Sequence, residues 1–96
     1  MRIVWLPPSR AVRMEAIDYI AQENPGAAMK LLEEIRRQTT CLVEFPGMER
    51  PGRVRGTREL VVNRTPFILV YRVRSRMERV EIIRILHGAQ QWPPMK

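Results

Sequence analysis

The sequence predicts a single α+β domain over residues 1–96, with the element order β-α-α-β-β-β and a helical hairpin packed on one face of a mostly antiparallel four-stranded sheet. Two observations predict this class. Apolar residues recur every three or four positions in the first half of the chain, whereas β-branched runs separated by short polar turns fill the second half. A chain of this length has room for one small core, and the hairpin is the available cover for the apolar face of the sheet.

The first half of the chain is predicted to form one strand and two helices. Ile3–Leu6 is a short apolar run that ends at two prolines, and proline suits the first turn of a helix. The first helix is expected from Ser9 to about Gln22. The second is expected from Pro25 to about Val43, with Asn24 as its N-cap. So short a connection predicts that the two helices lie antiparallel.

The second half is predicted to form an antiparallel meander of three strands. The strands are Arg58–Val62, Phe67–Arg74 and Arg79–His87, and short polar segments separate them. Strict alternation along the last strand gives two faces. One face holds Val80, Ile82, Arg84 and Leu86, and the other holds Glu81, Ile83, Ile85 and His87. The sheet face that the helices leave uncovered is expected to carry the arginine-rich set of side chains.

The charge of the chain is concentrated in its second half. The formal net charge is +7, and residues 1–48 carry equal numbers of basic and acidic side chains, so the whole excess lies in residues 49–96. Fifteen of the 17 basic residues are arginine, whose planar guanidinium group matches phosphate and carboxylate groups better than lysine does. This distribution indicates a nucleic-acid surface or a docking site for an acidic protein, and a solvated basic surface is the plain alternative.

Several classes of protein are excluded by composition. The chain has no run of about 18 apolar residues that could span a membrane, and its first residues lack the apolar core of a signal peptide. The single cysteine, Cys41, excludes an internal disulfide and gives no metal-binding motif. We therefore expect a cytoplasmic protein without a metal or another cofactor.

Three segments of the second half resemble the RelE/ParE superfamily of bacterial toxins. They are ERPGRVRGTREL (49–60), PFILVYRV (66–73) and VEIIRILHGAQQWP (80–93), and with the order of elements the resemblance covers nearly the whole chain. The resemblance implies the toxin of a type II toxin–antitoxin pair. It also implies a protein antitoxin whose flexible, often acidic segment folds around the toxin. The basic half of this chain suits such a partner.

The superfamily contains two activities, so the resemblance alone leaves the target open. RelE-like members cleave mRNA on the ribosome, whereas ParE-like members poison DNA gyrase without nuclease chemistry. RelE-like toxins commonly carry an arginine directly before the L-V-Y triplet, where this chain has Ile68, and they tend to carry a tyrosine after the last strand, where this chain has none. The resemblance therefore favours the ParE-like branch. The alternative is a ribosome-dependent mRNA endoribonuclease that uses Arg58, Arg84 and His87, with Glu59 or Glu49 as base.

The candidate contact residues lie in the basic loop and at the end of the last strand. Arg84 has apolar neighbours and needs a partner if it is buried, which either Glu59 or a ligand could supply. His87 and Trp92 also suit local packing, with Trp92 anchoring a C-terminal strap that begins at Gly88. The residues expected to contact the target or the antitoxin are Arg53, Arg55, Arg58, Arg84, His87 and Trp92.

Overall fold

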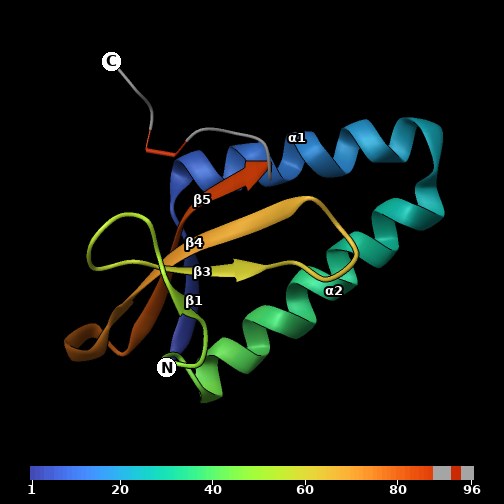
Figure 1. Ribbon diagram of the computed structural model, residues 1–96. Coiled ribbons are helices and arrows are strands. Elements are labelled where there is room, and N and C mark those ends of the chain that lie inside the picture. Colours follow the sequence, from blue (N-terminus) through green and yellow to red (C-terminus); the bar gives the residue numbers. More distant parts are fainter. Residues whose placement is uncertain (88–91, 94–96) are drawn as a thin grey trace.

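The computed structural model describes residues 1–87 and 92–93, and Figure 1 shows two long helices on one side of a twisted sheet. None of the helices in these residues is long and apolar enough to cross a membrane. The elements are β1 (Arg2–Trp5), α1 (Pro7–Glu23), α2 (Pro25–Glu44), β2 (Arg50–Pro51), β3 (Arg58–Val61), β4 (Phe67–Arg74), a 3-10 helix (Ser75–Met77) and β5 (Arg79–His87). The predicted α+β class and the helical hairpin are confirmed.

The described residues form a five-stranded sheet with the order β1-β5-β4-β3-β2. β1 runs parallel to β5, and the other neighbouring strands are antiparallel. The sequence predicted four strands, so it missed β2, in which Arg50 and Pro51 pair with Glu59 and Arg58. A two-residue strand is too short to show alternation of apolar and polar residues, which is why the pattern of the sequence does not reveal it.

Local capping explains where the two helices begin. α1 starts at Pro7, two residues earlier than predicted, because the two prolines occupy its first positions. The hydroxyl of the buried Ser9 donates to the carbonyl oxygens of Leu6 and Ile82, each at 2.8 Å, and so fixes the start of α1 to β5. The predicted N-cap of α2 is confirmed, since the side-chain oxygen of Asn24 accepts the backbone N–H of Ala27 at 3.0 Å.

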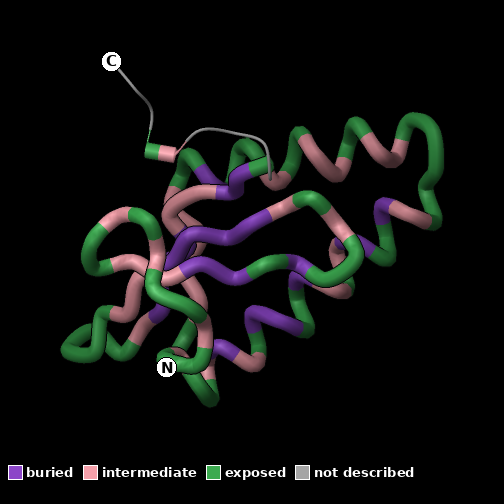
Figure 2. The backbone as a smooth tube through the Cα atoms, in the orientation of Figure 1, coloured by how far each residue is buried: buried purple, intermediate pink, exposed green. Residues whose placement is uncertain are grey.

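The main core lies between the helices and the sheet, where Figure 2 shows buried segments of α2 facing buried segments of the strands. Its buried members are Leu31, Ile35, Leu42, Leu60, Val62, Leu69, Tyr71, Val80, Ile82 and Ile85. Trp5 packs against this core. The hydroxyl of Tyr71 donates to the Pro46 carbonyl oxygen at 3.0 Å, and burial raises the pKa of that phenol to about 12.

A β-bulge between β4 and β5 decides which face each side chain of β5 occupies. Val70 pairs with Arg84 whereas Tyr71 pairs with Ile82, so Ile83 is an extra residue on β5. The predicted strict alternation is therefore wrong beyond Ile82. Arg84 was expected on the face of Val80 and Ile82, which is the core face, but the bulge turns it to the opposite side of the sheet.

The outer edge of β3 is covered by one side chain from α2. The buried Gln38 donates its side-chain amide to the Val61 carbonyl oxygen at 3.0 Å and accepts the backbone N–H of Asn63 at 2.8 Å. These two backbone groups point away from β4, because Val62 is the residue whose N–H bonds back to Phe67. Gln38 thus occupies the hydrogen-bonding positions that a further strand would need there.

Candidate functional site

The sheet face turned away from α1 and α2, called here the helix-free face, has a small apolar centre. Ile68, Val70 and Leu86 are buried there, and Trp92 packs against them. The position that directly precedes the L-V-Y triplet, Ile68, is thus an apolar packing position, 9% exposed. The remainder of the predicted C-terminal strap, residues 88–91 and 94–96, lies outside the described residues.

Arg84 lies on this face beside Trp92. Its guanidinium carbon is 5.7 Å from the centre of the Trp92 ring, within the range of a cation–π contact, and its Nη1 donates to the Ile83 carbonyl oxygen at 3.2 Å. Within residues 1–87 and 92–93 it makes no ion pair. Of the two partners that the sequence left open, Glu59 is not the one, since Arg50 and Arg53 hold that carboxylate. Arg84 is therefore a partly buried cation whose charge no described carboxylate offsets.

Glu59 is an ionised structural anchor for the basic loop. It is 2% exposed, and it accepts the backbone N–H of Arg53 at 2.8 Å, the Arg53 Nε at 3.1 Å and the Arg50 Nη2 at 3.3 Å. Burial alone would raise its pKa, but the hydrogen bonds from Arg53 and the charges of Arg53 and Arg50 lower it below the usual value. A carboxylate held in this way is unsuited to the role of a general base.

The basic loop between β2 and β3 is tightly closed. Its backbone is joined by a hydrogen bond from the Gly52 N–H to the Thr57 carbonyl oxygen, 2.8 Å long. A Cβ atom on Gly52 would come within 2.2 Å of the Thr57 hydroxyl, so only glycine fits this close approach. Arg53 is bound to Glu59, while Arg55 at the tip of the loop is exposed. Both side chains are exposed, and Arg53 is the one of these two predicted contact residues that pairs with a carboxylate.

Arg58 lies on the opposite side of the sheet from Arg84. It pairs across the strands with Tyr71, a member of the main core, and its Nη1 donates to the Glu49 carbonyl oxygen at 2.6 Å. This contact ties the segment after α2 to β3. Cross-strand partners share a face of the sheet, so Arg58 belongs to the helix side.

His87 also belongs to the helix side, at the end of β5. It pairs with Phe67, whose ring meets the His87 ring edge-on with the two centres 6.1 Å apart. Phe67 itself packs against the main core. The structure therefore does not bring Arg58, Arg84 and His87 together at one place, although RNA cleavage by these residues would require it.

A second buried carboxylate, which the sequence did not single out, lies near the end of the helix-free face. Glu81 is 1% exposed and accepts the Nε of Arg72 at 2.6 Å, the Nε of Arg74 at 3.3 Å and the Nη2 of Arg79. The hydrogen bond from Arg72 is the largest of the effects that lower its pKa to about 2, against the opposing effect of burial. The arginine side chains themselves cover the carboxylate. The alternation R-V-R in β4, which faces one glutamate of β5, is the sequence signal for this cluster.

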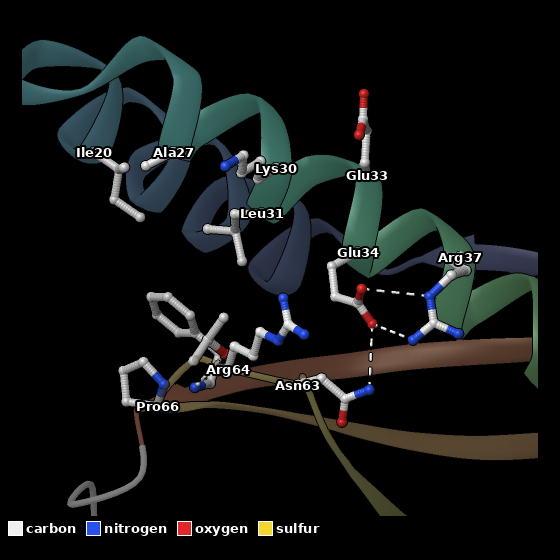
Figure 3. A pocket seen from close by; sticks show the side chains of 12 residues that line it. Ile20, Ala27, Lys30, Leu31, Glu33, Glu34, Arg37, Asn63, Arg64 and Pro66 are labelled. Carbon is white, nitrogen blue, oxygen red and sulfur yellow. Dashed lines mark hydrogen bonds and ion pairs between the residues drawn. The ribbon is translucent and has the colours of Figure 1, made fainter.

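A groove of about 570 Å³ runs between α2 and the turn that joins β3 to β4. Figure 3 shows Ile20, Ala27 and Leu31 on the helix side, facing Pro66 and Arg64 of the turn. On the rim, Glu34 accepts hydrogen bonds from Arg37 and from the Asn63 side-chain amide. The groove has an apolar floor and a charged rim, which is the character of a site for a protein segment. In residues 1–87 and 92–93 no group of three or more His, Cys, Asp or Glu side chains could hold a metal ion.

Comparison with known proteins gives three concordant results. A family described as "ParE toxin of type II toxin-antitoxin system, parDE" matches residues 3–92. A protein of Sinorhizobium fredii (strain NBRC 101917 / NGR234) named "Putative toxin Y4kP" is 42% identical over 94 residues, which covers 96% of this chain and 93% of that protein. A solved structure described as "Chromosomal ParDE TA system from P. aeruginosa" is similar with a TM-score of 0.76 and 29% identity, covering 91% of this chain and 95% of that one.

Proposed function

The chain belongs to the ParE toxin family of type II toxin–antitoxin systems, and from this premise we propose that it stops growth by poisoning DNA gyrase in the cytoplasm. The observation that carries the choice of target is the apolar centre of the helix-free face. Ile68 is buried there beside Val70 and Leu86. Cleavage of RNA passes through a phosphorane whose developing charge needs cationic neighbours, and an aliphatic side chain cannot supply them.

The separation of the remaining cations supports the same choice. Arg58 and His87 lie on the helix side of the sheet and Arg84 on the other, while Glu59 is neutralised by Arg50 and Arg53. Transfer of protons to and from one ribose needs an acid and a base within hydrogen-bonding reach of the same substrate atoms. The mRNA endoribonuclease, which the sequence left as the alternative, therefore has less support than a toxin that acts by binding.

We further propose that a cognate antitoxin neutralises the chain through a flexible, acidic segment. The net charge of +7 favours an acidic partner, because complementary charge speeds encounter and fixes register. The groove between α2 and the β3–β4 turn supplies an apolar floor on which such a segment could fold. Lys30 and Arg64 on the lining of the groove suit acidic side chains of the segment, whereas Arg37 already pairs with Glu34.

Addition of the purified chain to DNA gyrase and plasmid is expected to inhibit supercoiling and to accumulate linear DNA after detergent and protease treatment. A poison holds the enzyme on cleaved DNA, so the linear product measures the trapped intermediate directly. The matched assay contains translating ribosomes and mRNA in place of gyrase and plasmid. Unchanged gyrase activity together with cleaved mRNA would reverse the assignment of the target.

The two separated arginines give a test of which sheet face meets the target. Arg84→Ala is expected to weaken inhibition of gyrase by at least about tenfold, the loss expected for an interface contact worth ~1.4 kcal/mol. Its melting temperature should stay near that of the unchanged chain, because the described contacts of the Arg84 guanidinium group are with the Trp92 ring and the Ile83 carbonyl oxygen.

Arg58→Ala serves as the comparison on the other face. It is expected to lower the melting temperature, because the hydrogen bond to the Glu49 carbonyl oxygen is lost, while inhibition by the folded fraction is retained. Inhibition and melting temperature are measured on the same preparations. The assignment of the helix-free face fails if Arg84→Ala inhibits gyrase as well as the unchanged chain does.

A further inference from the structure

Three arginines stand in a straight row across three neighbouring strands at one end of the helix-free face. Arg2 of β1 pairs with Arg79 of β5, and Arg79 pairs with Arg74 of β4. The side chain of Arg2 points to this face because its neighbour Ile3 packs against the main core on the other side. Figure 1 shows the start of β1 and the turn between β4 and β5 at the same end of the molecule. This set, with Arg72 in the adjacent position, is called here the arginine row.

The positive charge of the arginine row exceeds the negative charge of Glu81, the carboxylate that pairs with it. Neighbouring strands lie about 4.8 Å apart, and like charges directly opposite one another destabilise a sheet. The single carboxylate of Glu81 serves Arg72, Arg74 and Arg79 together, and Arg2 has no ion pair in the described part of the chain. The side chains of Arg72, Arg74 and Arg79 remain 39%, 48% and 25% exposed. A polyanion that meets this end would therefore find oriented, partly unneutralised guanidinium groups.

We propose that the arginine row binds the sugar–phosphate backbone of duplex DNA, a surface separate from the Arg84 contact and independent of which target the toxin inhibits. Duplex DNA carries one negative charge per about 1.7 Å of its axis, so several phosphates fall within the width of three strands. Guanidinium groups bind phosphate oxygens through paired hydrogen bonds. The bonds to Glu81 hold three of these groups in place before the DNA arrives.

The composition of the arginine row favours duplex DNA over an acidic protein segment and over single-stranded RNA. A protein segment in extended form places same-face side chains about 7 Å apart and would need an unbroken acidic run to match the row. Protein interfaces also centre on aromatic or aliphatic anchors, and the members of the row are all arginine. Single-stranded RNA is recognised largely by stacking of its bases on aromatic rings, of which the row has none. Backbone contacts to a duplex require only fixed positive charge.

The salt dependence of binding to a fluorescent 20-base-pair DNA duplex tests the proposal with the full-length chain. If the four arginines neutralise four phosphates, the slope of log K against log salt is about −3.6, a loss of roughly a hundredfold between about 50 and 200 mM salt. The double variant Arg2→Gln/Arg74→Gln should reduce the slope to about −1.8, a loss of roughly tenfold over the same range. Glu81 keeps Arg72 and Arg79 in this variant, so the fold is expected to persist.

The matched control is Arg10→Gln/Arg36→Gln, which removes the same charge from exposed positions on the helices. Its slope should equal that of the unchanged chain. Equal slopes for the two double variants would overturn the proposal, because the affinity for DNA would then depend only on the net charge of the chain. Tighter binding of a 20-nucleotide single-stranded RNA or of a poly-glutamate peptide, lost in Arg2→Gln/Arg74→Gln, would overturn the choice of duplex DNA. Melting curves of both variants confirm that folded chains are compared.

Discussion

Bacteria that express this chain without its antitoxin are expected to lose colony formation by several orders of magnitude. A gyrase poison turns the enzyme into a source of DNA breaks, so the effect grows with each trapped complex and a few toxin molecules suffice. Plating under inducing and repressing conditions measures the loss. Induction of the DNA-damage response within one generation would distinguish broken DNA from arrested translation.

The control for this result is a chain that cannot fold. Leu42 is fully buried in the main core, and Leu42→Asp places a charge where it has no partner. This variant should be harmless at the same level of expression. Co-expression of the proposed cognate antitoxin should restore plating. Normal growth on induction of the folded, unchanged chain would contradict the proposed toxicity, although not the membership of the family.

Among single substitutions on the helix-free face, Glu81→Ala is expected to cause the largest loss of stability. A fully buried charge pair costs about 3–5 kcal/mol to break, and the partial exposure of the arginines reduces this to about 2–3 kcal/mol. For a chain of this size that corresponds to a fall in melting temperature of roughly 10–20 °C. The cause is repulsion among Arg72, Arg74 and Arg79 once their shared carboxylate is gone.

The matched control is Glu33→Ala, which removes an exposed carboxylate from α2 and should change the melting temperature little. The pH dependence gives a second check. Because the pKa of Glu81 is lowered from 4.5 to about 2, its contribution is complete above about pH 4.5 and is lost as the pH falls toward 2. The gap in stability between the unchanged chain and Glu81→Ala should therefore close over that range. A gap that stays constant from pH 6 to pH 2.5 would show that the carboxylate is not the cause.

The helices and the long strands could be predicted because their signals are local. The spacing of apolar residues and the N-cap at Asn24 depend on neighbours in the sequence, and they gave boundaries within two residues for α1 and α2. The bulge could not be predicted. Ile82, Ile83 and Ile85 offer apolar side chains to both faces of β5, so the sequence is compatible with either register beyond Ile82.

The predicted site residues depended on partners that the pattern of the sequence does not identify. For Arg84 the sequence left Glu59 or a ligand as the partner, and Glu59 pairs instead with Arg53 and with Arg50, which the short β2 strand brings to it. The cluster around Glu81 was missed because its arginines come from two strands whose pairing is known only from the fold. Which charged side chains pair depends on the register of the strands. The composition of the second half of the chain does not determine that register.

The side chain of Gln38 restricts where another chain could add a strand to the sheet. With the part of β3 beyond β2 closed, the described residues leave β1 and the two-residue β2 as the edge strands to which another chain could add, and β1 is the longer of the two. There the backbone groups of Ile3 and Trp5 point outward, since Arg2 and Leu6 direct their N–H groups to β5. A strand from a partner, or from a second copy, would consequently be seated next to Arg2. Within the described residues, backbone pairing by another chain is thus blocked by Gln38 at Val61 and Asn63, whereas the outer groups of β1 are directed away from the sheet.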